Sequence, residues 1–209
     1  MGTSTIFQKA GVGPEEVLTD VLAGSVATYP TDASQDGRFL LYQQSTTRGY
    51  DLGVLPIAGD RKATSFVDSP ANEVQGRFSP NGRWVAYTSD ESGKFEVYVR
   101  PFPAESTQST TISIAGGMQP EWRRDGKELF YISADGKLTA VPVVTDGAAF
   151  SAGAPRALFD VEVPEATAPY ATDYAVTADG QRFLVNTVVD QPTRPALTVI
   201  LNWTAALNK

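Results

Sequence analysis

Charged residues recur at a fixed distance before turn signals in this chain. Counting back five residues from a glycine that follows Asp or Asn gives Asp32, Arg77 and Glu121. Two more acids, Glu73 and Asp173, lie near the starts of the same segments. Carboxylate oxygens are the ligands that hard cations such as Ca²⁺ prefer, and an arginine beside a carboxylate forms a charge-assisted hydrogen bond. The pattern therefore predicts either a cation site or a set of ion pairs.

The residue types that are missing exclude several kinds of chemistry. The sequence contains no histidine and no cysteine. A Ser-His-Asp triad, an imidazole base, a histidine-ligated zinc site and a thiolate nucleophile therefore cannot be built. Any catalysis would depend on carboxylates, Lys, Tyr, Ser or a hard metal bound through oxygen.

The charge and hydropathy patterns also limit the partners. The chain has 17 basic and 24 acidic residues, so its net charge is −7, and its basic residues cluster only in pairs such as Arg61-Lys62 and Arg123-Arg124. Nucleic acid requires a basic footprint, so it is not an expected partner. No apolar run approaches the roughly 18 residues that cross a bilayer, and residues 1–5 show no signal-peptide pattern, so no membrane insertion is expected. These observations leave the compartment unassigned.

Four segments repeat one pattern, in which Asp-Gly or Asn-Gly is followed by a polar residue and then an aromatic or aliphatic run. The glycines of these dipeptides are Gly37, Gly82, Gly126 and Gly180. Such a dipeptide between β-rich runs is a strong hairpin signal, because both turn residues must tolerate positive φ. The repeat predicts four hairpins in register, about 45 residues apart for the first three.

The elements that must position the charged residues are short strands. No stretch shows sustained helical periodicity, and Gly and Pro separate the β-rich runs at regular intervals. Short strands with this punctuation are typical of an all-β sandwich, barrel or propeller, and the fixed period favours a β-propeller of four-stranded antiparallel blades. The blades are expected at about 27–67, 73–114, 117–160 and 169–203, with 5–19 as strands of a preceding or closing blade. A sandwich is the alternative.

The repeat also resembles a known family. Residues 78–93, which begin Phe-Ser-Pro-Asn-Gly-Arg-Trp-Val-Ala-Tyr, resemble the repeat of TolB-like (WD40-like) β-propellers. Residues 96–103, 119–131 and 202–204 are similar to the propeller at the C-terminal end of bacterial serine/threonine kinase-like proteins. None of the kinase phosphate-binding or catalytic-loop motifs occurs, so the resemblance does not imply kinase activity.

The predicted blade number is smaller than the resemblance implies, since complete propellers of this type usually have six or more blades. About four units are visible, and the last has three predicted strands, at 173–177, 181–188 and 197–203. The chain therefore looks like a partial propeller from a longer protein. An open arc would expose sheet edges and blade faces. We expect closure either by residues 16–19 completing the last blade or by a homo-oligomer of two arcs.

The alternation of side chains along a strand places the candidate residues. Four residues before each glycine lies an apolar residue that should fill the gap between blades (Ala33, Phe78, Trp122 and Val176). The residues one position earlier should then face the central channel. The predicted ligand-binding residues are Asp32, Arg77, Glu121 and Tyr170. The predicted metal ligands are Glu73, Glu121 and Asp173.

Two functions from different classes fit this pattern. The first is a non-catalytic propeller, without cofactor or catalytic residues, that senses or binds a protein or small molecule at the channel mouth. The second is a metal-dependent hydrolase of the lactonase, arylesterase or phosphotriesterase kind, which would use the channel carboxylates to hold Ca²⁺ or another divalent cation. In the first case the same charges would form ion pairs that join neighbouring blades.

Overall fold

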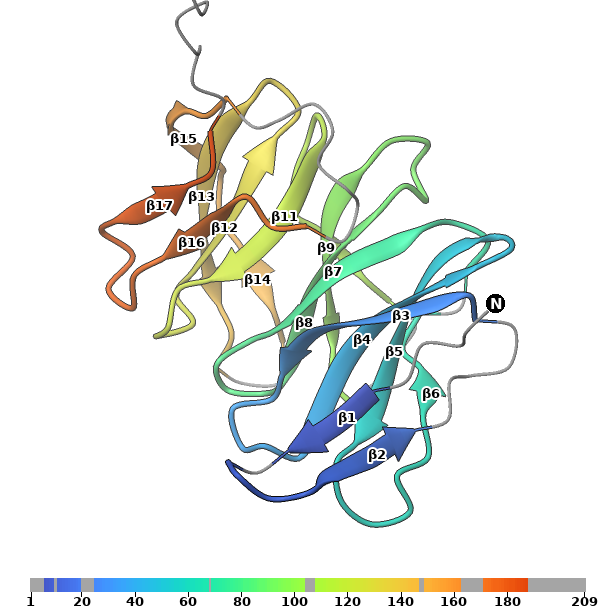
Figure 1. The fold of residues 1–209 in the computed structure, drawn as a ribbon. Coiled ribbons are helices and arrows are strands. Elements are labelled where there is room, and N and C mark those ends of the chain that lie inside the picture. The colour runs from blue at the N-terminus through green and yellow to red at the C-terminus, as the bar shows by residue number, and fades with distance from the viewer. Residues whose placement is uncertain are drawn as a thin grey trace, which may run out of the picture.

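The computed structural model describes residues 6–9, 11–19, 25–67, 69–103, 108–146, 149–162 and 171–187. These segments contain strands and turns and no helix, arranged in antiparallel sheets around a curve (Figure 1). No helix capable of spanning a membrane occurs in them. The predicted all-β fold of antiparallel blades is confirmed.

Each repeat unit forms one sheet whose strands follow the chain from the inside outward. The first blade consists of β3 (Ala27–Ala33), β4 (Phe39–Thr46), β5 (Gly49–Pro56) and β6 (Thr64–Ser65). The second consists of β7 (Glu73–Phe78), β8 (Trp84–Ser89), β9 (Glu96–Pro101) and β10 (Thr110–Thr111).

The later units depart from four strands. The third blade consists of β11 (Gly117–Trp122), β12 (Glu128–Ser133) and β13 (Lys137–Val144), with both β14 (Ser151–Ala152) and β15 (Arg156–Asp160) paired to β13. The fourth unit consists, within the described residues, of β16 (Tyr174–Val176) and β17 (Phe183–Val185). Its predicted third strand, 197–203, lies outside the described residues.

The four predicted turns are present, but only part of their predicted geometry is right. The glycines have φ of 70°, 69°, 71° and 70°, whereas the Asp or Asn before each of them does not have positive φ. In the first turn Gly37 N–H donates to Ser34 O at 2.8 Å, and Asp36 Oδ1 accepts Arg38 N–H at 3.0 Å. The Asp or Asn therefore serves as a side-chain acceptor, and the glycine alone supplies the left-handed conformation.

The core consists of apolar layers between adjacent blades. Strand β8 shows the alternation: Val85 and Tyr87 pack toward the first blade, and Ala86 packs toward the third. Burying a side chain such as that of Val85 contributes about 1.5–3 kcal/mol. Two of the predicted gap-filling residues, Phe78 and Trp122, are buried between blades. Because side chains alternate along each strand, each blade presents apolar side chains to both neighbouring blades, and these side chains hold the blades face to face.

The remaining two predicted gap-filling residues lie at the ends of the arc. Val176 packs with the layer between the third and fourth units. Ala33 is exposed, unlike its counterparts in the later blades. The difference arises because Ala33 ends the inner strand of the first blade, where no earlier four-stranded blade is described.

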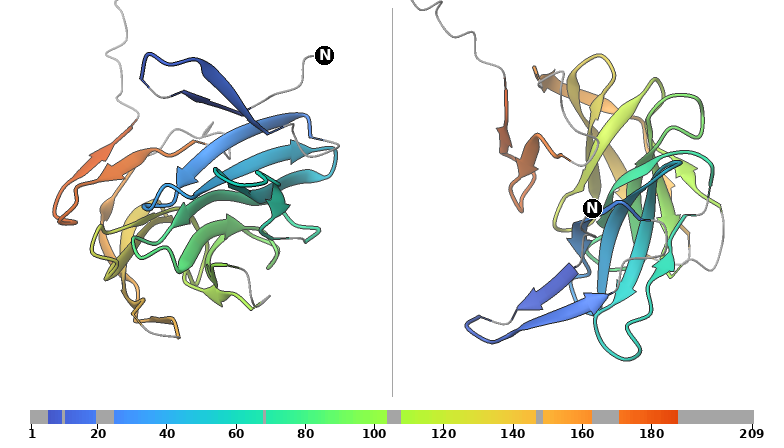
Figure 2. Two further views of the ribbon diagram at one scale, coloured as in Figure 1. Left: turned by 90° about the horizontal axis from the view of Figure 1, so that it is seen from below. Right: turned by 45° about the vertical axis from the view of Figure 1, so that its right-hand side comes forward.

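The N-terminal hairpin, β1 (Ile6–Lys9) and β2 (Glu15–Thr19), packs beside the first blade (Figure 2). Its Ile6 and Leu18 are buried against Tyr42 and Leu55. Within the described residues, strand β2 pairs with β1 and not with β16 or β17, so closure of the last blade by residues 16–19 is not seen among them. The hairpin gains its apolar burial at the first blade instead. Closure by a second arc stays a prediction.

Candidate functional site

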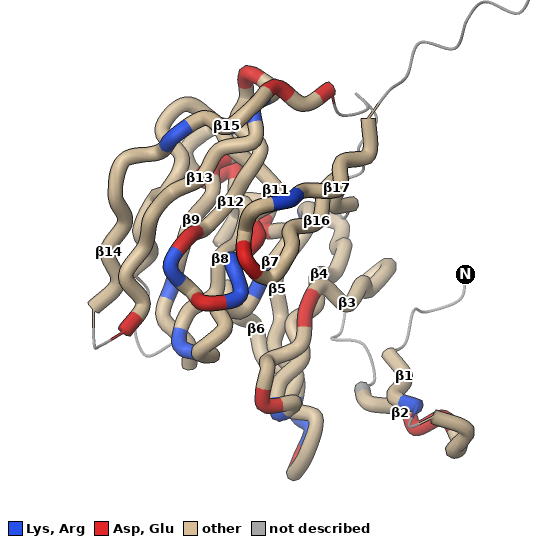
Figure 3. Tube along the Cα trace, turned by 90° about the vertical axis from the view of Figure 1, so that its left-hand side faces the viewer, with Lys and Arg blue, Asp and Glu red and all other residues tan. Residues whose placement is uncertain are grey.

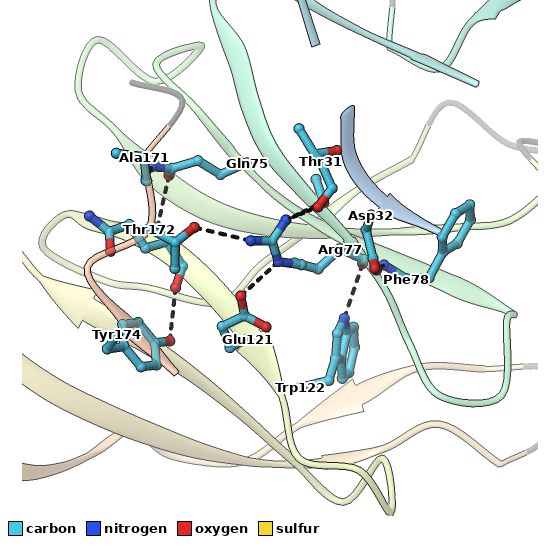
Figure 4. A network of polar contacts seen from close by, with 12 residues as sticks. Thr31, Asp32, Gln75, Arg77, Phe78, Glu121, Trp122, Ala171, Thr172 and Tyr174 are labelled. Atoms are coloured by element: carbon cyan, nitrogen blue, oxygen red, sulfur yellow. Dashed lines mark hydrogen bonds and ion pairs between the residues drawn. The ribbon is translucent and has the colours of Figure 1, made fainter. Parts of the chain in front are cut away.

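The Arg77 side chain joins four units of the arc. Its Nε donates to Glu121 Oε1 at 2.7 Å, its Nη2 donates to Thr172 Oγ1 at 3.0 Å, and its Nη1 donates to the carbonyl of Thr31 (Figure 4). These partners belong to β11, to the segment before β16, and to β3. Only 17% of the Arg77 side chain and 22% of the Glu121 side chain are exposed. The guanidinium is therefore a cross-link between blades.

Asp32 joins the first and second blades through its carboxylate. Its Oδ2 accepts Phe78 N–H at 2.8 Å, and its Oδ1 accepts Ala33 N–H at 2.8 Å. Burial raises the pKa of Asp32, while these backbone donors and the Arg77 guanidinium act in the opposite direction. Both carboxylate oxygens are therefore used in holding backbone.

Glu121 experiences the same balance. Burial raises the pKa of Glu121; the charge and hydrogen bond of Arg77 lower it, and the nearby Asp32 carboxylate raises it further. Its strand neighbour Trp122 donates from Nε1 to the carbonyl of Arg77 at 3.1 Å. The structure thus brings Asp32, Arg77 and Glu121 together, as the spacing predicted, in a set of inter-blade bonds. Their predicted role in ligand binding stays a prediction, and Tyr170 lies outside the described residues.

A series of glutamines, which the sequence reasoning missed, continues this cross-linking. Gln75 and Gln119 have φ of 58° and 59° and sit in β-bulges of β7 and β11. Gln43 Oε1 accepts Gln75 N–H at 3.1 Å, and Gln75 Oε1 accepts Gln119 N–H at 2.9 Å. Gln119 Oε1 in turn accepts Asp173 N–H at 2.7 Å. Each side chain therefore accepts a backbone N–H of the next unit, at the bulges of β7 and β11 and just before β16.

A signal for this series exists in the sequence. Gln75, Gln119 and Asp173 each lie seven residues before the turn glycine of their unit. The equivalent position of the first unit is Pro30, which is next to a register shift in β3. A side-chain acceptor at one repeat position marks a place where the backbone leaves the regular ladder.

Replacing Gln119 with alanine is expected to lower the free energy of unfolding by about 2 kcal/mol. The change removes the acceptor of Asp173 N–H and the donor to Asp173 Oδ2, which lies 2.8 Å from Gln119 Nε2, in a buried setting. Urea unfolding of the parent and the variant measures the loss. Gln35→Ala, at an exposed turn position, is the matched control and should change little. Equal effects of the two substitutions would contradict the role assigned to the series.

The three predicted metal ligands lie in separate hydrogen-bond networks. Glu73 Oε1 accepts from Ser69 Oγ at 2.5 Å, whereas Glu121 pairs with Arg77. Asp173 accepts from Gln119 through Oδ2, and from Asn186 Nδ2 at 3.2 Å through Oδ1. In the part of the chain that the structure describes, no three acids are placed to hold one metal ion. The predicted calcium site therefore has no common centre there.

Several of the remaining charges form local ion pairs. Figure 3 shows Lys, Arg, Asp and Glu distributed over the strands and turns, with blue and red segments adjacent in some turns. Examples of exposed pairs are Arg38 with Asp36 at 2.6 Å and Lys9 with Glu15 at 3.6 Å. Exposed pairs of this kind contribute little to stability.

Comparison with known proteins supports the fold. No family model matches the chain, and no curated protein matches it. Among solved structures, TolB from Acinetobacter baumannii is similar with a TM-score of 0.60 and 17% identity, over 83% of this chain and 40% of that one. A puromycin-hydrolyzing peptidase from Mycobacterium tuberculosis has a TM-score of 0.60 and 17% identity, over 85% and 34%.

A third similar structure is a protein assigned as a 6-phosphogluconolactonase from Bacteroides uniformis, with a TM-score of 0.51 and 14% identity, over 77% and 47%. This chain spans less than half the length of each of these three proteins. Identities this low establish the fold alone. Together with the blades, they define a TolB-like β-propeller fold for this chain.

Proposed function

We propose that this chain is a non-catalytic propeller module that binds a protein or a small molecule at its channel mouth. The observation that carries the proposal is the use of the channel charges. Arg77 directs its donors at Glu121, Thr31 and Thr172, so the groups expected to do chemistry are joined to one another. A general base or a metal ligand must instead be available to a substrate or an ion.

The channel mouth still offers a surface for recognition. Arg77 and Glu121 keep part of their side chains in contact with solvent, and they are held rigidly by partners from four units. Rigid, partly exposed polar groups suit specific binding because little conformational entropy is lost when a ligand meets them. Since one fold hosts binding modules and hydrolases alike, the site geometry and not the fold supports this assignment.

We expect calcium to leave the thermal unfolding of this chain unchanged. The test compares unfolding with calcium and with EDTA for the parent, Glu121→Gln and Asp173→Asn, and adds hydrolysis assays on a simple lactone and an aryl ester. A hydrolase built on channel carboxylates would instead gain stability of RT ln(1 + [L]/Kd) from calcium. Both substitutions would weaken that gain. That result, together with metal-dependent turnover, would overturn the proposal.

The binding half of the proposal needs its own measurement. A thermal-shift screen with short peptides and small polar metabolites identifies candidate ligands, and hydrogen exchange locates them. A ligand at the channel mouth should slow exchange in β7 and β11, where Arg77 and Glu121 lie. Ligands that protect only the outer strands would contradict binding at the mouth.

A further inference from the structure

Glu73 is a buried carboxyl group that lacks a charged partner. It begins β7 and has no exposed surface. Its Oε1 accepts from Ser69 Oγ at 2.5 Å and from Ser89 Oγ at 3.5 Å, whereas its Oε2 is buried without a hydrogen-bond partner. Within the described residues no lysine or arginine pairs with it. A buried carboxylate normally has a cation or a full set of donors.

A pocket opens beside this group. Its volume is about 530 Å³. The lining residues are Ser69, Pro70, Ala71, Asp90, Glu91 and Gly93. Both charged residues of the lining are acids, and the Asp51 and Glu91 carboxylates add to the negative potential at Glu73. The pocket therefore attracts a cation and repels an anion.

Ser69 connects the pocket to Glu73. Ser69 is one of the lining residues, and its hydroxyl donates to Glu73 and accepts Ala71 N–H at 3.0 Å. A hydroxyl oxygen has two lone pairs, so one acceptor position of Ser69 Oγ is left for a ligand. A donor bound there would be linked through the hydroxyl to the Glu73 carboxylate. The acidic lining would destabilise an oxyanion, which argues against Ser69 as a nucleophile.

The walls of the pocket are held in place by Asn72. Its backbone N–H and its Nδ2 both donate to the Asp90 carboxylate, each at 2.7 Å, and its Oδ1 accepts Tyr50 N–H at 3.1 Å. These bonds tie the loop before β7 to turns of the first and second blades. Both carboxylate oxygens of Asp90 therefore accept hydrogen bonds from Asn72. The exposed Glu91 is then the lining acid that can contact a ligand.

We propose that this pocket binds one primary ammonium group, either of a lysine side chain or of a free amine. The ammonium donates to Ser69 Oγ and pairs with Glu91, and Glu73 supplies the buried counter-charge behind the hydroxyl. A divalent metal fits less well, because no three acids of the described residues converge to coordinate one. This site lies apart from the Arg77 channel, so the inference does not depend on the proposed function.

The probes are n-butylammonium and Nα-acetyl-lysine methylamide, titrated into the full chain at pH 8 in phosphate buffer free of amines. Amide NMR signals of Ser69, Ala71 and Glu91 should shift and saturate. Tetramethylammonium has the same charge but no N–H donor, so it should give no saturating shift. Tighter binding of the lysine derivative would indicate a peptide ligand, and equal binding would indicate a free amine.

Two variants make the test decisive. Glu73→Gln and Glu91→Gln should each weaken butylammonium binding at least tenfold, whereas Asp60→Asn, which removes an exposed acid elsewhere, should not. If Glu73→Gln fails to fold, the exposed Glu91→Gln still provides the comparison. Absence of saturation in the parent, an equal response to tetramethylammonium, or unchanged affinity in the glutamine variants would overturn the inference. None of these results bears on calcium or on the channel mouth.

Discussion

Replacing Arg77 with methionine is expected to lower the free energy of unfolding by about 3–5 kcal/mol. The substitution keeps much of the side-chain length but removes the donors to Glu121, Thr31 and Thr172. Glu121 would then be a largely buried carboxylate facing Asp32 without its counter-charge. Removing one partner of a buried pair costs more than the pair itself contributes, because the remaining charge is left desolvated.

Urea unfolding at pH 7 measures this effect, with two companions. The double variant Arg77→Met/Glu121→Gln should recover part of the loss, because the unpaired charge is gone. Arg38→Met, which breaks an exposed ion pair with Asp36, should change stability little. A loss in Arg77→Met no greater than in Arg38→Met would contradict the role of Arg77 as the central cross-link.

The second large effect is a dependence of stability on pH that originates at Glu73. Burial raises the pKa of Glu73 from 4.5 to about 7; hydrogen bonds from Ser69 and Ser89 oppose the rise, and the charges of Asp51 and Glu91 add to it. The folded state therefore holds its proton more tightly than the unfolded chain does. The stabilisation is fully present below pH 4.5 and is lost as the pH rises through 7. A rise of this size corresponds to about 3 kcal/mol.

The measurement compares the unfolding free energies of the parent and Glu73→Gln from pH 4 to pH 8 without amine buffers. The difference between the two proteins should change by about 3 kcal/mol across this range, in favour of the variant at high pH. Because only the pH dependence of this difference is interpreted, any pH-independent effect of the glutamine on the free energy of unfolding cancels. It also removes the contributions of Asp32 and Glu121, whose pKa values burial raises as well. Parallel curves for the two proteins would contradict the assignment to Glu73.

Much of the fold follows from local patterns in the sequence. The turn signals at Asp36-Gly37 and its three counterparts depend on residues within five positions of one another, so they are visible without any knowledge of the packing. The alternation along strands such as β8 likewise predicts which side chains lie between blades, because a strand has a period of two. The same spacing singled out Asp32, Arg77 and Glu121, which the structure brings together.

The partners of those side chains were decided only by the tertiary structure. Arg77 meets Thr31, Glu121 and Thr172 across sequence separations of 46, 44 and 95 residues. Such meetings depend on how the blades are set around the channel and on the bulges at Gln75 and Gln119, which no local propensity specifies. Likewise, the sequence placed Glu73 near a strand start, but its burial beside Ser69, without a cation, follows from the packing of the first and second blades. Local turn chemistry and strand periodicity therefore determine the repeat, whereas long-range packing determines which charges are paired and which carboxyl group is buried without a cation.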